Sequence, residues 1–273
     1  MSRNLTEEEV AAVALFLSGE RLATFQALAG STRDAINLHQ QMLQLASSLM
    51  GVTAVVEIAL RNAICDRLSD HFKVAGWLLH PPAPFQWHAS EKDKIKQAVR
   101  SAQRAAYAKK SQNDKRALDV LAFPNGAPAG ISHDDRSSAR QRAISVSTGQ
   151  VIAQLTMFFW KRLYSDDYEQ ALWRTALKRV FPDKTLKRAT IAAQLERIYQ
   201  TRNRIAHHEP VYGRRLADTL IAIDFVVKNF GTPDADGITP IGKLLENDLL
   251  AVKQEATDLE SKLTEFRTGS LPP

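Results

Sequence analysis

The segment Arg202–Pro210 (RNRIAHHEP) places arginine, asparagine and histidine side chains close together in the chain. An arginine guanidinium is a planar fork of N–H groups that matches phosphate oxygens, and a histidine, with an ordinary pKa of about 6.5, exchanges a proton near neutral pH. Together these groups suit cleavage of an RNA phosphodiester. In that reaction the 2′-hydroxyl attacks the neighbouring phosphate, and the protein only moves protons and stabilises negative charge, without a metal ion.

The spacing within this segment does not by itself decide between catalysis and structure. Asn203 and His207 are four residues apart and so share one face of a helix, while Arg202 is long enough to reach the same phosphate from the side. An arginine followed closely by a histidine also arises by chance, and we assign no chemistry to Arg33 and His39. On spacing alone a structural role is favoured: Arg202 in a surface salt bridge, and His207 as a cation stabilised by the helix dipole by ~0.3–1 kcal/mol.

Metal and cofactor chemistry finds little support in the sequence. His207, His208 and Glu209 are adjacent, but successive helical side chains diverge by about 100° and do not readily converge on one ion. Cys65 is the single cysteine, which excludes an intramolecular disulfide and a thiolate metal cluster. The G-x-S-x-G, G-x-x-x-x-G-K, G-x-G-x-x-G and H-E-x-x-H motifs do not occur. We expect no metal and no cofactor.

Composition places the chain among ordinary globular proteins. Its 273 residues are 44% hydrophobic and 24% charged, which is enough for a large buried core. The net charge of +6 favours a polyanionic partner only weakly. The longest apolar stretches, Val10–Leu17 and Leu220–Val227, are shorter than the ~20 residues that span a bilayer. We expect a cytoplasmic protein with no membrane association.

The elements that must position these residues are predicted to be helices, so the expected fold class is all-α. Thr6 and Glu9 form a capping box that opens a helix ending near Gly19, and a short helix follows to Gly30. From Leu38 to Leu68 apolar residues recur at intervals of three and four, which predicts a long helix or helix pair with a bend or break at Gly51.

The middle of the chain contains two expected loops and a basic helix. Prolines make residues 76–89 a connecting loop, and Ser90 is expected to cap the next helix. That helix carries Lys92, Lys94, Lys96, Arg100, Arg104, Lys109 and Lys110. A solvated polar face is the simpler interpretation, and a track for a phosphate backbone is the alternative. Glycine, proline and serine predict a loop over 123–138, within an insertion near 122–146.

The second half of the chain is expected to add further helices. Ser147 or Thr148 caps a helix that continues to Leu163, and another covers Tyr168–Phe181. The helix that carries Arg202 opens near Thr185, and Pro210 forces its end. Helices over Arg214–Phe230 and over residues 240–266 follow, and residues 270–273 are expected to be a frayed tail.

Four stretches, in order, resemble one known family. RNRIAHHEPV, from Arg202, resembles the end-helix signature of the Abi-like (abortive infection) family of the HEPN superfamily. EIALRNAI, from Glu57 to Ile64, resembles the upstream helix of that family. Gly149–Thr156 with Phe159 and Trp160, and then Trp173 with Phe181 and Pro182, also match, whereas Met157-Phe158 departs from the pattern. The resemblance spans roughly residues 33–230.

The resemblance implies a fold and an assembly. The expected fold is a HEPN-type helical bundle with additional N- and C-terminal helices: residues 1–30 form an N-terminal helical extension, and residues 31–273 form a single Abi-like domain. The family expectation is a homodimer in which two copies of the arginine–histidine motif form a composite active site. An RNA substrate and an antitoxin or regulator are the implied partners.

The resemblance also implies residue roles. Arg202 would neutralise the scissile phosphate, Asn203 would orient it or the histidine, and His207 would act as general acid or base. Glu57 and Arg61, four apart on one helix face, would pair to support the motif together with Asn62. Weaker candidates for substrate contact are Arg204, His208, Tyr212, Lys92 and Lys96.

Two functions follow as expectations. The first is a metal-independent endoribonuclease of the phage-defence (abortive infection) or toxin type. Its products would carry a 2′,3′-cyclic phosphate and a 5′-hydroxyl. The second is a non-catalytic HEPN-fold module that binds RNA or a partner protein, for which the basic helix around residues 92–110 is the motivating feature.

Overall fold

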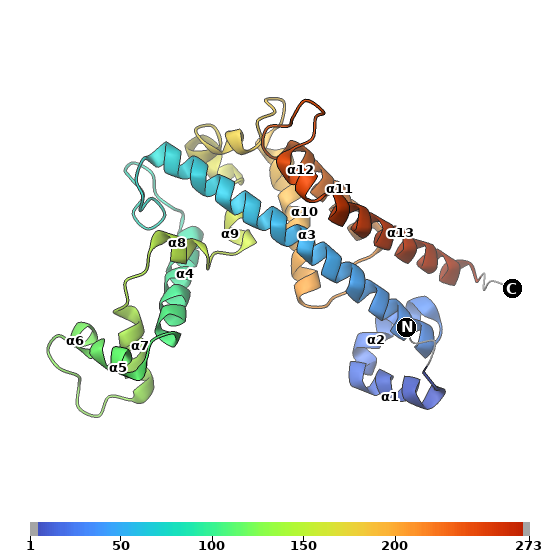
Figure 1. Ribbon diagram of the computed structural model, residues 1–273, viewed down its shortest axis with the longest axis horizontal. Coiled ribbons are helices and arrows are strands. Elements are labelled where there is room, and N and C mark those ends of the chain that lie inside the picture. Colours follow the sequence, from blue (N-terminus) through green and yellow to red (C-terminus); the bar gives the residue numbers. More distant parts are fainter. Residues whose placement is uncertain (1–4, 270–273) are drawn as a thin grey trace. The chain divides into compact units, whose positions relative to one another are not determined.

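The computed structural model describes residues 5–269 and contains helices but no strands within that range (Figure 1). The expectation of an all-α protein is therefore confirmed, while the HEPN-type bundle stays a prediction. The frayed tail expected at residues 270–273 lies outside the described residues.

The chain forms two compact units. The first comprises Met1–Asn62 and Lys178–Pro273, and the second comprises Ala63–Leu177. Helix α3 (Thr32–Phe72) contributes to both units. The expected boundary at residue 30 does not separate them, because the N-terminal helices belong to the first unit. A single domain over residues 31–273 stays a prediction.

The first unit is built from long helices. Besides the first part of α3 these are α1 (Glu7–Leu17), α2 (Gly19–Ala29), α10 (Arg188–Ala206), α11 (Gly213–Asn229), α12 (Pro240–Leu244) and α13 (Glu246–Thr268). Val10, Leu22 and Ile36 are buried together where α1 and α2 pack on α3. The N-terminal helices are thus joined to the unit by a hydrophobic core.

The second unit has shorter elements after the end of α3. They are α4 (Ala89–Ala108), α5 (Gln112–Ala117), α6 (Asp119–Ala122), α7 (His133–Arg142), α8 (Thr148–Ile152) and α9 (Met157–Arg162). Short 3₁₀ and π turns follow over Asp166–Tyr168 and Glu169–Trp173, and a further 3₁₀ turn covers Leu177–Val180.

Local capping signals in the sequence are confirmed. The Glu9 amide donates to Thr6 Oγ1 at 3.2 Å, and the Thr6 amide donates to the Glu9 carboxylate at 2.7 Å. Gly30 ends α2 in the left-handed conformation, with φ 77°. Ser147 caps α8 in a second capping box with Gln150. Each signal depends only on residues within one turn, so neighbouring sequence suffices to predict it.

The expected break at Gly51 is wrong, because α3 is continuous over 41 residues. A glycine inside a helix costs about 1 kcal/mol relative to alanine. Leu49 and Val52 on either side are buried to within 1% of full burial. Burial of such side chains contributes about 1.5–3 kcal/mol each. Packing of the apolar stripe therefore outweighs the local preference of one glycine.

The expected loops and helix limits need further corrections. Helix α7 lies inside the insertion expected near 122–146, where Ser132 accepts the Asp135 amide at 3.1 Å and opens it. His88, not Ser90, precedes the first residue of α4, and the Ser90 hydroxyl donates to Glu91 instead. The helix expected after Ser147 is divided into α8 and α9, and the helix expected over 240–266 into α12 and α13.

Helix α3 is also long and apolar enough to cross a bilayer, judged by length and composition alone. Uninterrupted apolar stretches do not detect it because serine, threonine and glutamine residues are scattered through it. A third of its most apolar 18-residue window is buried inside the protein. A core helix of a soluble protein passes the same test, so the absence of membrane association stays a prediction.

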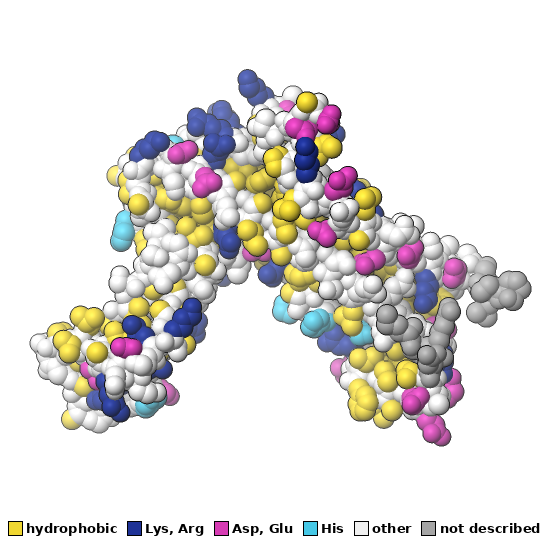
Figure 2. Space-filling model, in the orientation of Figure 1, with side chains coloured by type: hydrophobic (Ala, Val, Ile, Leu, Met, Phe, Trp, Pro, Cys, Tyr) yellow, Lys and Arg dark blue, Asp and Glu magenta, His cyan; other side chains and the backbone are white. Residues whose placement is uncertain are grey.

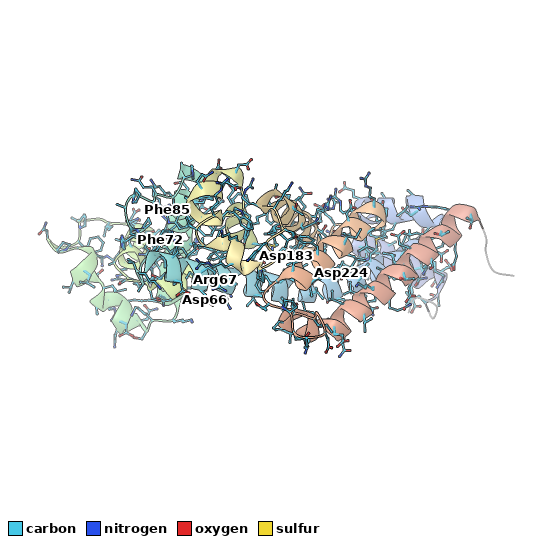
Figure 3. All side chains as sticks on the ribbon, turned by 90° about the horizontal axis from the view of Figure 1, so that it is seen from above. Asp66, Arg67, Phe72, Phe85, Asp183 and Asp224 are labelled. Atoms are coloured by element: carbon cyan, nitrogen blue, oxygen red, sulfur yellow. The ribbon has the colours of Figure 1, made fainter. Side chains whose placement is uncertain are left out.

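A buried carboxylate and an aromatic cluster form the core of the second unit. Phe72 and Phe85 lie with their ring centroids 5.1 Å apart (Figure 3). Beside them Glu91 is 1% exposed and accepts the Tyr168 hydroxyl at 2.6 Å, and Arg162 Nε lies 3.3 Å from its other oxygen. Burial, and next the hydrogen bond to the Glu91 carboxylate, raise the pKa of Tyr168. The hydroxyl and guanidinium groups together stabilise a carboxylate that burial would otherwise destabilise.

Tyr168→Phe is expected to lower the free energy of unfolding by about 1.5–3 kcal/mol, because it removes a buried hydrogen bond to a charged group. Urea unfolding followed by circular dichroism measures this. Tyr212→Phe is the matched control, since the half-buried Tyr212 hydroxyl makes no hydrogen bond with the described residues. Equal stability of Tyr168→Phe and wild type would contradict the role given to this network.

Candidate functional site

Arg202 and Glu57 bring together the two segments that the sequence singles out. Arg202 lies on α10 just before its last turn, and its Nε is 3.7 Å from a carboxylate oxygen of Glu57 on α3. The two side chains are 34% and 17% exposed, so the pair lies at the surface but is partly covered. The surface salt bridge considered for Arg202 is therefore present, and its partner belongs to the other segment.

The position of Arg202 follows from the packing of α10. One face of this helix is buried through Ile191, Leu195, Ile198, Thr201 and Ile205. Its most extensive packing is against α11, where the hydroxyls of Thr201 and Thr219 lie 2.7 Å apart (Figure 1). With that face fixed, the neighbouring Arg202 is directed along the side of α10 that meets α3.

The end of α10 is a Schellman motif. The His208 amide donates to the Ile205 carbonyl and the Glu209 amide donates to the Arg204 carbonyl, both at 2.9 Å. His208 has φ 55°, a left-handed conformation that non-glycine residues seldom adopt. The helix therefore ends at Ala206, before Pro210 can force its end.

His207 is the first residue after the helix and its side chain is exposed. Its amide donates to the carbonyls of Asn203 and Arg204 at 3.1 Å. The imidazole makes no hydrogen bond or ion pair with residues 5–269, and neither does the side-chain amide of Asn203. Both side chains are thus available to a ligand, although His207 is not held on a helical face as the spacing predicts.

Arg204 and His208 take part in fixing the turn. Arg204 forms an ion pair with Glu209 at 2.9 Å, and Arg21 on α2 donates to the His208 carbonyl at 3.3 Å. Tyr212 is half-buried and precedes α11. Figure 2 shows histidine side chains beside Lys and Arg side chains over the end of α10 and the adjacent α2. The region is thus rich in basic side chains, but Arg204 is engaged by a carboxylate.

The expected pair between Glu57 and Arg61 is wrong, because Glu57 pairs with Arg202. Arg61 Nε is buried without a hydrogen-bond partner in the described part of the chain. Asn62 is exposed on α3. Of the three supporting residues, the structure brings only Glu57 into contact with the motif.

Lys92 and Lys96 belong to the second unit, on the exposed face of α4. Lys92 donates to Gln86 at 3.4 Å, and Lys96 lies 3.8 Å from Asp93. Both line a hollow of about 400 Å³ with Phe85 and other residues of the preceding loop. The two lysines therefore line one hollow of the second unit, whereas the α10 segment belongs to the first unit.

Two hollows in the first unit lie away from the α10 motif. A groove of about 910 Å³ lies between α11 and α13, and a hollow of about 390 Å³ is lined by residues of α10 and α11 that include Arg197 and Arg215. Neither is lined by Arg202 or His207. These two hollows are therefore distinct from the candidate site.

Sequence reasoning missed His39, a buried histidine of α3 close enough to Arg21 and His208 to be influenced by their charges. His39 is 4% exposed, packs edge-on against Phe25 with centroids 5.0 Å apart, and its Nε2 has no hydrogen-bond partner in residues 5–269. Burial, and then the nearby charges of Arg21 and His208, lower its pKa below the ordinary value of 6.5. Its place on the apolar face of α3 was the signal that could have identified it as a buried histidine.

Comparisons with protein-family models, with curated proteins and with solved structures gave no match. Within residues 5–269 no group of three or more histidine, cysteine, aspartate or glutamate side chains is arranged to hold a metal ion.

His39 is expected to make the protein less stable at acidic pH. Because its folded-state pKa is lowered, its contribution to stability is complete above the unfolded-state pKa of about 6.5 and is lost as the pH falls below it. His39→Leu should flatten the dependence of the unfolding free energy on pH. Urea titrations at several pH values, from roughly one unit above 6.5 to roughly one unit below it, measure this.

The exposed His133 provides the matched control, and His133→Leu should leave the pH dependence unchanged. An unaltered pH dependence in His39→Leu would show that the buried imidazole does not control acid stability.

Proposed function

We propose that this protein is a metal-independent endoribonuclease of the abortive-infection or toxin type, related to the Abi-like family of the HEPN superfamily. The observation that carries the proposal is the Glu57–Arg202 contact at 3.7 Å. It joins two segments, EIALRNAI and RNRIAHHEPV, which are far apart in the chain and each of which resembles that family. RNA is the proposed substrate. We also propose a cytoplasmic location, and an antitoxin or regulator as a further partner.

Arg202 retains the donors needed to hold a phosphate. A guanidinium has five N–H donors, and Glu57 lies nearest to Nε. The separation of 3.7 Å is too long for a hydrogen bond, so the carboxylate orients the guanidinium by charge and leaves its N–H groups for phosphate oxygens. The free side-chain amide of Asn203 would orient the same phosphate.

His207 would transfer the protons. In the proposed reaction a base removes the 2′-hydroxyl proton, the 2′-oxygen bonds to phosphorus, and the bond from phosphorus to the 5′-oxygen breaks as an acid protonates that oxygen. One imidazole serves one of these transfers at a time. A homodimer with His207 from both copies at a composite active site would supply the base and the acid together.

A second candidate is a module that binds RNA or a partner protein without cleaving it. The exposed basic face of α4 favours it, since Lys92 and Lys94 form no ion pair with described residues. RNA binding without products would support this alternative.

His207→Ala is expected to reduce RNA cleavage by about 10²–10⁴-fold, the usual contribution of a general acid or base. Purified protein is incubated with total RNA in the presence of a chelator, and products are separated on a denaturing gel. His133→Ala, which removes an exposed histidine of the other unit, should cleave at the wild-type rate. Equal cleavage by His207→Ala and wild type, or strict dependence on added metal, would contradict the proposal.

A further inference from the structure

A polar groove on the second unit lies between helices α4 and α7. Its volume is about 650 Å³, and three arginines line it: Arg100, Arg104 and Arg142. The other lining side chains are amides and hydroxyls, such as Gln97 and Ser138, and no carboxylate is among them. The groove is thus a concentrated positive charge surrounded by neutral hydrogen-bonding groups.

The three arginines have no carboxylate partners within residues 5–269, and all three are exposed. Other arginines of the same unit are paired: Arg140 on α7 with Asp119 at 2.6 Å, and Arg162 with Glu91 at 3.3 Å. Arg67 and Arg116 of this unit also form no ion pair with the described residues, but at the groove three unpaired guanidiniums line one hollow.

The groove is held in shape by contacts that a merely solvated face does not need. The Gln103 side-chain amide donates to the carbonyls of Arg142 and Ile144, at 3.2 and 3.0 Å, and so ties the end of α7 to α4. Arg104 donates to the Ser101 hydroxyl at 3.2 Å, which orients its guanidinium.

A structural role explains only one of the three arginines. Arg142 lies in the last turn of α7, where the helix dipole favours a cation. Arg100 and Arg104 are four residues apart in the middle of α4, where like charges repel and destabilise the helix. A bound anion would remove that repulsion.

We propose that this groove binds the phosphate backbone of single-stranded RNA. The inference rests on the proposed function for the identity of the polyanion. Arg100 and Arg104 are separated by about 6 Å along the helix, a distance similar to that between successive phosphates of a strand. Arginine forks bind phosphate oxygens in pairs, and the surrounding amides and hydroxyls are suited to ribose hydroxyls. Binding would be independent of base sequence and strongly dependent on salt.

The test measures binding of a fluorescently labelled single-stranded RNA by anisotropy, with the full chain in a His207→Ala background so that cleavage does not interfere. R100Q/R104Q/R142Q should weaken binding at least about tenfold at low salt. It should also reduce the slope of log affinity against log salt by about 2, as expected for three lost phosphate contacts on a single strand.

The matched control is R67Q/K73Q/R116Q, which removes the same charge from exposed positions of the same unit outside the groove. It should bind RNA within about twofold of the His207→Ala parent. Thermal melting confirms that both triple variants are folded. Equal losses in both variants, or no loss in the groove variant, would overturn the proposal.

Inorganic tripolyphosphate distinguishes a small anion from a strand. Tripolyphosphate that binds tightly at the groove without displacement by RNA would overturn the RNA assignment, and mutual competition would support it. A wild-type protein that cleaves no RNA, combined with selective loss of binding in the groove variant, would remove the nuclease proposal and leave the groove established. Cleavage of RNA by the wild type, with unchanged RNA binding by the groove variant, would support the nuclease proposal and overturn the groove proposal.

Discussion

The ion pair between Glu57 and Arg202 is the interaction on which the candidate site depends. Helix α10 is fixed by its apolar face against the core, and the guanidinium of Arg202 leaves the side of that helix where α3 passes. A carboxylate at this point holds the charge in place without neutralising every N–H donor. Moving Glu57 elsewhere would leave Arg202 a mobile surface cation, free to find other partners.

The turn after α10 gives His207 a fixed location while its side chain stays exposed. The Schellman bonds and the Arg204–Glu209 ion pair define the path of the backbone, and the Arg21 side chain binds the His208 carbonyl from α2. The N-terminal helix α2 therefore contributes to the site through one hydrogen bond, and the buried His39 of α3 is near enough to be influenced by the charge of His208. Rigid backbone beside free polar side chains is the arrangement that both binding and proton transfer require.

Sequence was sufficient where structure depends on neighbours within a turn. Thr6 with Glu9 and Ser147 with Gln150 are capping boxes that nearby residues determine. Sequence failed where distant segments compete: the spacing of Glu57 and Arg61 predicts a pair, but Arg202 arrives from α10 and takes the carboxylate. In the same way, the basic helix predicted from the sequence includes Arg100 and Arg104, but Arg142 joins them only when α7 folds onto α4, so the sequence did not indicate this groove.

Two double-mutant cycles, measured on the free energy of unfolding, test most directly whether Glu57 forms its ion pair with Arg202. In urea titrations, Glu57→Gln and Arg202→Gln should show a coupling on the order of 0.5 kcal/mol, typical of a partly exposed pair. The cycle of Glu57→Gln with Arg61→Gln should show a coupling near zero. Coupling of about 0.3–0.5 kcal/mol between Glu57 and Arg61, with none to Arg202, would mean that the carboxylate pairs within its own helix and that the two segments do not meet as described.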